Sequence, residues 1–215
     1  PLGESIIFPG SRCRECKYKI RFYENIPILS WIFLKGRCAN CNLEISLIYP
    51  LIEILTGFLF LLNNYSIHSR FAIESQYISA TFGWIFISIL LIMSILDIKY
   101  LWLPVNICIL GILIAIFLSI FIGIKNDDIF SILFVIETFI ATFFGYLFFQ
   151  IISFIGLHLY KKPAMGKGDS KLAAMIGAWL GLKGLFVSIW LAFNFAGLFA
   201  ILGLISRKLK RDQKI

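Results

Sequence analysis

Two aspartates lie where long apolar stretches meet charged ones. Asp97 ends one apolar run, and Asp169 stands in residues 164–172 among small and basic neighbours, namely Gly166, Lys167, Gly168 and Lys171. A charged side chain at the edge of a membrane segment is costly and therefore marks a candidate functional site. Two carboxylates about 3 Å apart share a proton, so that one activates water as a base while the other acts as an acid. This is the chemistry of aspartic proteases.

The alternative is that both aspartates are ordinary helix-end carboxylates. Asp169 precedes a helical run, where a capping carboxylate is expected in any case. The two residues are 72 positions apart (169 − 97), so their proximity does not follow from the sequence. Gly166 and Gly168 favour a functional role, because glycine lets backbone approach a substrate or form a strained turn.

The N-terminal region carries a second group of chemically active side chains. Four cysteines form two Cys-x-x-Cys pairs: Cys13, Cys16, Cys38 and Cys41. This spacing is typical of a zinc ion held by four thiolates, and such a closed site is structural, not catalytic. The alternative is a pair of disulfides or free thiols, and a reducing cytoplasm disfavours the disulfides. Cys108 lies in an apolar run and is expected to be a small apolar residue of a helix.

The composition indicates an integral membrane protein with helical spans. Hydrophobic residues make up 60% of the 215 residues, charged residues 15%, and the mean hydropathy is +0.89. The net charge of +8 comes from lysines and arginines between apolar runs. We interpret them as orientation signals facing anionic lipid, and we expect no nucleic-acid partner.

The chain divides into a polar module, a membrane region and a basic tail. We predict domains at residues 1–46, 47–206 and 207–215, and an all-α polytopic fold. About six transmembrane helices are expected, at residues 47–62, 80–96, 104–124, 129–159, 172–182 and 185–205, with a turn at Lys183-Gly184 before the last. The distribution of lysine and arginine places the cysteine module, the Asp97 link, the loop of residues 161–171 and the tail in the cytoplasm.

Among the polar side chains inside these spans, three are given specific expectations. Glu53 is expected to be neutral and hydrogen-bonded, or to face the cysteine module, in a structural or methyl-donor-binding role and not a catalytic one. Glu137 and Asn194 are expected to bond between helices.

Several motifs together resemble one family, the bacterial type IV prepilin leader peptidases and N-methyltransferases. The resemblance covers nearly the whole chain, from about Ser11 to Ile205. It is carried by the four cysteines in order, both aspartates, the Leu103-Pro104 pair and the stretches of residues 25–31, 36–38, 49–53 and 166–169. The Gly-x-Gly-Asp piece alone is shared with other intramembrane aspartyl proteases.

The resemblance implies a bifunctional enzyme of the bacterial inner membrane, working in type IV pilus or type II secretion systems. It would cut the basic leader from prepilins or pseudopilins at a catalytic pair, Asp97 and Asp169, facing the cytoplasm. It would then methylate the new N-terminus with S-adenosylmethionine, near Gly36, Arg37 and Glu53. The family's first membrane helix and its last segment are not in this sequence, which we expect to be a piece of a longer protein.

Two alternatives belong to other classes. One is a transporter that uses the two aspartates for proton or cation coupling, although few charges lie in the middle of the spans. The other is a truncated, inactive member of the family.

Overall fold

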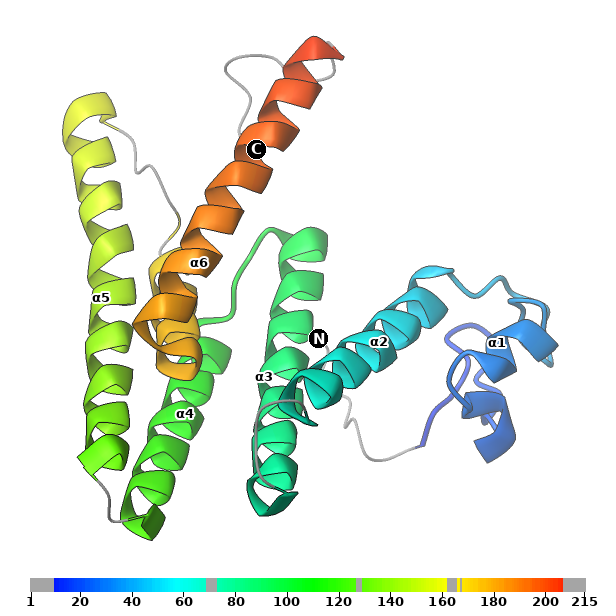
Figure 1. Cartoon of the computed structure of the whole chain (residues 1–215). Coiled ribbons are helices and arrows are strands. Elements are labelled where there is room, and N and C mark those ends of the chain that lie inside the picture. Colours follow the sequence, from blue (N-terminus) through cyan, green and yellow to red (C-terminus); the bar gives the residue numbers. More distant parts are fainter. Residues whose placement is uncertain (1–9, 69–72, 127–128, 162–165, 167, 207–215) are drawn as a thin grey trace. The chain divides into compact units, whose positions relative to one another are not determined.

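The computed structural model describes residues 10–68, 73–126, 129–161, 166 and 168–206. The chain forms two compact units, residues 1–91 and 92–215, with the boundary inside one long helix. All named elements of the described residues are helices, as predicted (Figure 1). They are η1 (Phe22–Asn25), α1 (Leu29–Phe33), α2 (Ile48–His68), α3 (Ile73–Tyr100), α4 (Val105–Asn126), α5 (Ile129–Tyr160) and α6 (Asp169–Ile205).

The first unit begins with a small module of turns and short helices. Its extended pairings are single bridges, between Arg12 and Lys19 and between Arg37 and Glu44. Elements η1 and α1 pack together, and the chain then enters α2. Cys38 is the one buried hydrophobic side chain among the described residues before α2. The module therefore has almost no apolar core.

Helices α4, α5 and α6 pack together in the second unit. Small residues allow α5 and α6 to touch backbone to backbone. A Cβ added at Gly145 of α5 would lie 2.6 Å from the carbonyl oxygen of Ala173, and one at Gly177 of α6 would lie 2.4 Å from that of Ala141. The small residues of 172–182 thus allow close helix contact, and α5 is the neighbour.

Helix α6 is broken at Gly181, where φ is 67° and ψ is −175°. The chain changes direction there, as Figure 1 shows. We predicted this turn at Lys183-Gly184, which is wrong by two to three residues: both are helical, and Gly181 adopts the positive φ. Residues 169–180 measure about 18 Å at 1.5 Å per residue, which is too short to cross a bilayer core of about 30 Å.

Within the part of the chain that the structure describes, four helices are long and apolar enough to cross a membrane, and residues Val105–Phe121 form a shorter apolar helix. Many of their large apolar side chains are exposed, as expected for a surface that lipid covers. The prediction of a helical membrane protein is confirmed, while the number of six spans stays a prediction. The observed helices α2 and α3 extend beyond the predicted spans.

The predictions for the two other polar residues had different outcomes. Glu137 of α5 accepts a hydrogen bond from the backbone N–H of Leu182 in α6 at 3.2 Å, so the predicted bond between helices is confirmed. The Asn194 side chain instead donates to the carbonyl of Trp190 at 2.7 Å, within its own helix. That prediction was wrong because a helix offers its own carbonyls at i−4 to a short polar side chain.

Candidate metal centre and active site

The four cysteines lie in two knuckles, tight turns with the same backbone geometry. In the first, the N–H of Cys13 donates to the carbonyl of Tyr18 at 2.9 Å, and Lys17 has a φ of 55°. In the second, the N–H of Cys38 donates to the carbonyl of Leu43 at 2.9 Å, and the residue after its second cysteine has a φ of 56°. Each knuckle therefore presents two thiols from one turn.

The four sulfur atoms have the spacing of a tetrahedral metal site. The Sγ atoms of Cys13 and Cys41 are 3.8 Å apart, those of Cys16 and Cys38 are 4.0 Å apart, and all four lie within 4.8 Å of one another. With Zn–S bonds of about 2.3 Å, the edge of a tetrahedron is about 3.8 Å. A disulfide requires about 2.05 Å, and all four cysteines are free. These residues fit a zinc ion.

Local hydrogen bonds make the thiols unequal. The Asn40 side chain, together with the backbone of Tyr18, lowers the pKa of Cys16 to about 6. A backbone hydrogen bond with Leu43 acts to lower the pKa of Cys41, but burial and the neighbouring thiols raise it to about 12. The lowered pKa makes Cys16 mostly thiolate at neutral pH, which favours metal binding because the thiolate is the ligand.

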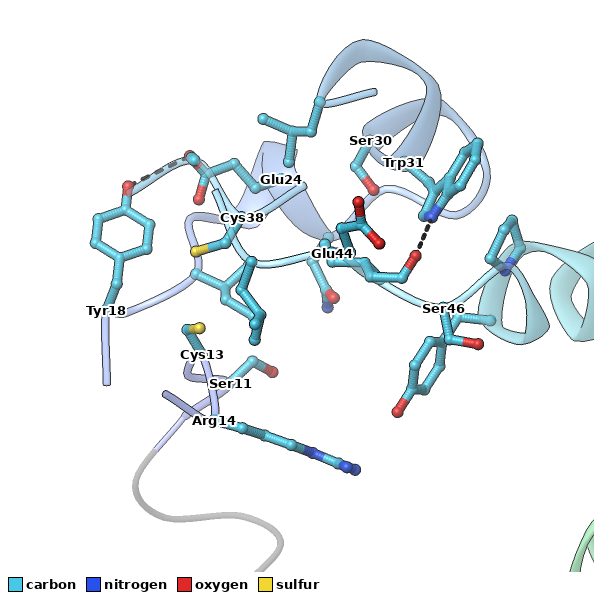
Figure 2. A pocket seen from close by; sticks show the side chains of 18 of the residues that line it. Ser11, Cys13, Arg14, Tyr18, Glu24, Ser30, Trp31, Cys38, Glu44 and Ser46 are labelled. Atoms are coloured by element: carbon cyan, nitrogen blue, oxygen red, sulfur yellow. Dashed lines mark hydrogen bonds between the residues drawn. The ribbon is translucent and has the colours of Figure 1, made fainter. Parts of the chain in front are cut away.

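A cavity of about 530 Å³ lies beside the knuckles and reaches the start of α2 (Figure 2). Four carboxylates line it, along with aromatic side chains and parts of both knuckles. The carboxylates are Glu15, Glu24, Glu44 and Glu53, and the aromatic residues are Tyr18, Trp31 and Tyr49. Sequence reasoning did not single out Glu15, Glu24 or Glu44, since no spacing distinguishes them from surface residues.

Glu53 of α2 holds a strained turn at the edge of this cavity. Ile28 has φ 63° and ψ −52°, and the N–H of Leu29 donates to the carbonyl of Pro27 at 2.6 Å, which defines a γ-turn. A β-branched residue at positive φ is a genuine outlier. The N–H of Ile28 donates to the Glu53 carboxylate at 2.7 Å. The prediction that Glu53 is hydrogen-bonded and faces the module is confirmed.

Gly36 and Arg37 have different surroundings. Gly36 has a φ of 67°, and a Cβ there would lie 2.7 Å from the Trp31 ring, so only glycine fits. Trp31 in turn donates its indole N–H to the carbonyl of Ile45 at 3.1 Å (Figure 2). The Arg37 guanidinium lies 3.9 Å from Glu44, and both side chains are mostly exposed, so this ion pair contributes little.

Asp169 is tied to the backbone at the start of α6. Its carboxylate accepts a hydrogen bond from the N–H of Gly166 at 2.9 Å, and its own N–H donates to the carbonyl of Gly166 at 3.2 Å. These two hydrogen bonds fix the turn that leads into α6, whose first residue is Asp169. A Cβ at Gly166 would lie 3.3 Å from the carboxylate oxygen, so this glycine leaves the oxygen room.

The segment that follows Asp97 reaches the glycine next to Asp169. A Cβ at Gly168 would lie 2.8 Å from the Cβ of Leu103. Asp97 itself is exposed in the last turn of α3, and Asp169 is half-buried. The pairing of the two carboxylates stays a prediction. Lys171 is half-buried in the first turn of α6, and Lys167 lies outside the described residues.

Comparison with known proteins identifies the family. Residues 84–202 match the family model described as the type IV leader peptidase family, and residues 1–67 match the bacterial peptidase A24 N-terminal domain. The chain belongs to the type IV leader peptidase family. The family match takes in both Asp97 and Asp169, and the N-terminal match takes in all four cysteines. No solved structure matches the chain.

Curated members of the family give the same result. The chain is 34% identical over 185 residues to a prepilin leader peptidase/N-methyltransferase of Myxococcus xanthus. The aligned region covers 86% of this chain and 51% of that protein. A protein of the same name from Dichelobacter nodosus is 32% identical over 181 residues, or 82% of this chain and 57% of that protein. The chain thus spans about half the length of these relatives. The transporter alternative is not favoured.

Proposed function

We propose that this chain is the core of an intramembrane aspartyl endopeptidase that removes the basic leader from type IV prepilins and pseudopilins. The proposal is supported by the family membership together with one contact, that of Gly168 with Leu103, which joins the segments carrying Asp169 and Asp97. One carboxylate would take a proton from water while the other gives a proton to the leaving amine. The Gly166 N–H would orient the Asp169 carboxylate during this exchange.

The orientation follows from charge. Lysines and arginines of the cysteine module, the residue 161–171 loop and the tail would face the cytoplasm, so both aspartates would act at that surface of the inner membrane. The domain division at residues 1–46, 47–206 and 207–215 is part of this proposal. Zinc, held by Cys13, Cys16, Cys38 and Cys41, would fix the module and take no part in cleavage.

A second activity, N-methylation of the new N-terminus, is supported by the cavity of the module. Its volume of about 530 Å³ is in the range of cofactor sites. Its carboxylates suit a cationic ligand, and its aromatic rings suit an adenine and a sulfonium group. S-adenosylmethionine would supply the methyl group when bound. Glu53 would keep the cavity wall in place through Ile28, and Gly36 would do so through Trp31.

The decisive experiment is cleavage of a purified pilin precursor by the chain in liposomes. We expect Asp97→Asn and Asp169→Asn each to abolish cleavage while helix content and bound zinc stay unchanged. Asn194→Leu serves as the control, because the Asn194 side chain bonds only within its own helix in the described structure. Retained cleavage in either aspartate variant would refute the catalytic pair.

A further inference from the structure

The break in α6 takes some N–H groups out of the helical hydrogen-bond pattern. At the start of the segment that follows Gly181, the first N–H groups lack a helical acceptor. A partly buried N–H without an acceptor costs free energy, so a neighbouring element that supplies an acceptor stabilises the break.

Glu137 of α5 supplies that acceptor. Its Oε1 accepts the N–H of Leu182 at 3.2 Å, and a Cβ at Gly181 would lie 2.7 Å from the same oxygen. Glycine is thus required at the break both for its φ of 67° and for the room that the carboxylate occupies. The positive end of the following helix segment also stabilises a carboxylate at this position.

The first part of α6 (residues 169–180) is fixed at three further points. Its backbone touches that of α5 where Gly145 meets Ala173 and where Gly177 meets Ala141. The indole N–H of Trp179 donates to the carbonyl of Gly111 in α4 at 3.0 Å. The direction of this segment therefore depends on its backbone contacts with α5, on its hydrogen bond to α4 and on the break itself.

We propose that Glu137 is a positioning residue for the active site: by holding the break in α6, it sets the direction of the segment that begins with Asp169. The inference rests on the proposed catalytic role of Asp169. Glu137 acts as a hydrogen-bond acceptor, so a neutral side chain with a carbonyl oxygen in the same place can replace it. An apolar side chain of similar size cannot.

Two readouts separate positioning from loss of folding. The first is cleavage of a pilin precursor, where a displaced Asp169 lowers kcat and leaves KM unchanged. The second is labelling of Cys108, which is fully buried in α4, close enough to Lys171 of α6 for an electrostatic interaction. If residues 169–180 move, this thiol becomes accessible to N-ethylmaleimide. The full chain is labelled in liposomes, and the Cys108 adduct is quantified by mass spectrometry.

We expect Glu137→Gln to stay within about twofold of the parent chain in both readouts. Glu137→Leu should lower kcat roughly tenfold or more and raise the Cys108 labelling rate by a similar factor, because the Leu182 N–H is left without a partner. Gly181→Ala should behave like Glu137→Leu without changing the carboxylate. Asn194→Leu is the matched control, since Asn194 bonds only within its own helix in the described structure.

Parent-like kcat and labelling in Glu137→Leu and Gly181→Ala would overturn the proposal. Equal loss in Glu137→Gln and Glu137→Leu would also overturn it, because the charge and not the acceptor would then matter. Helix content by circular dichroism confirms that each variant is folded. If the parent chain cleaves no precursor, the proposed peptidase function fails, while the labelling of Cys108 still decides whether Glu137 holds the break.

Discussion

Gly168 and Leu103 approach each other so closely that a Cβ at Gly168 would lie 2.8 Å from the Cβ of Leu103. Gly168 immediately precedes Asp169, and Leu103 lies in the link that follows Asp97. This contact is the point at which the two aspartate-bearing segments touch. A glycine is needed next to Asp169 because any larger residue at position 168 would collide with Leu103.

Replacement of this glycine should therefore impair catalysis more than stability. We expect Gly168→Ala to reduce precursor cleavage roughly tenfold or more, because the new Cβ forces the two segments apart. The matched control is Gly197→Ala in α6, where a Cβ meets no atom within 4 Å. Cleavage rates of the two variants in liposomes test this prediction. Equal activity of both would show that the contact does not position Asp169.

Zinc should be essential to the module and dispensable for the membrane helices. We expect Cys38→Ser to abolish zinc binding, because a four-thiolate site that loses one ligand loses most of its affinity for zinc. The module has almost no apolar core that could hold it together without the metal. The change should increase proteolysis of residues 10–46 and leave the helical circular dichroism nearly unchanged. Metal content by mass spectrometry gives the primary result. Cys108→Ser, outside the cluster, should keep its zinc.

The unequal thiols predict a bend in the pH dependence of zinc affinity. Zinc displaces each proton still bound to a ligand thiol, so log affinity rises with pH with a slope equal to the number of protons displaced. The pKa of Cys16 is lowered to about 6, so this thiol contributes a proton below pH 6 and none above it. The pKa of Cys41 is raised to about 12, so its proton is displaced throughout. The slope should fall by about one proton across pH 6.

Competition with a chelator of known affinity between pH 5 and 8 measures this slope. Asn40→Ala should move the bend to higher pH, because the Asn40 side chain is the largest cause of the lowered pKa of Cys16. A constant slope through pH 6 in the parent chain would contradict the assignment. A bend at the same pH in Asn40→Ala and in the parent chain would also contradict it.

Glu53 should affect methyl transfer and not cleavage. We expect Glu53→Ala to reduce methyl transfer roughly tenfold, because the N–H of Ile28 loses its acceptor and the strained turn relaxes. Glu53→Gln keeps an acceptor and should retain most of the activity. Transfer from radiolabelled S-adenosylmethionine to a cleaved pilin gives the rate, with leader removal by the same sample as internal control. Parallel loss of both activities would point to misfolding instead.

The sequence predicted what depends on local spacing. Two Cys-x-x-Cys pairs were enough to predict a four-sulfur cluster, and long apolar runs were enough to predict helices. The break in α6 was misplaced because Gly177, Gly181 and Gly184 are equally suitable glycines by sequence. A carboxylate 44 positions earlier (181 − 137) distinguishes Gly181 from the others. The Glu53 contact with Ile28 likewise joins residues 25 positions apart, which no periodicity reveals.

The contacts of Gly145 with Ala173 and of Gly177 with Ala141 also have an evolutionary consequence. Even one methyl group at either glycine would collide with the backbone of the opposite helix, so a mutational path through alanine is closed unless both helices shift together. The apolar residues around them can exchange freely among similar sizes. Across distant homologues with this helix pair, the two glycines should therefore change more slowly than the bulky side chains around them.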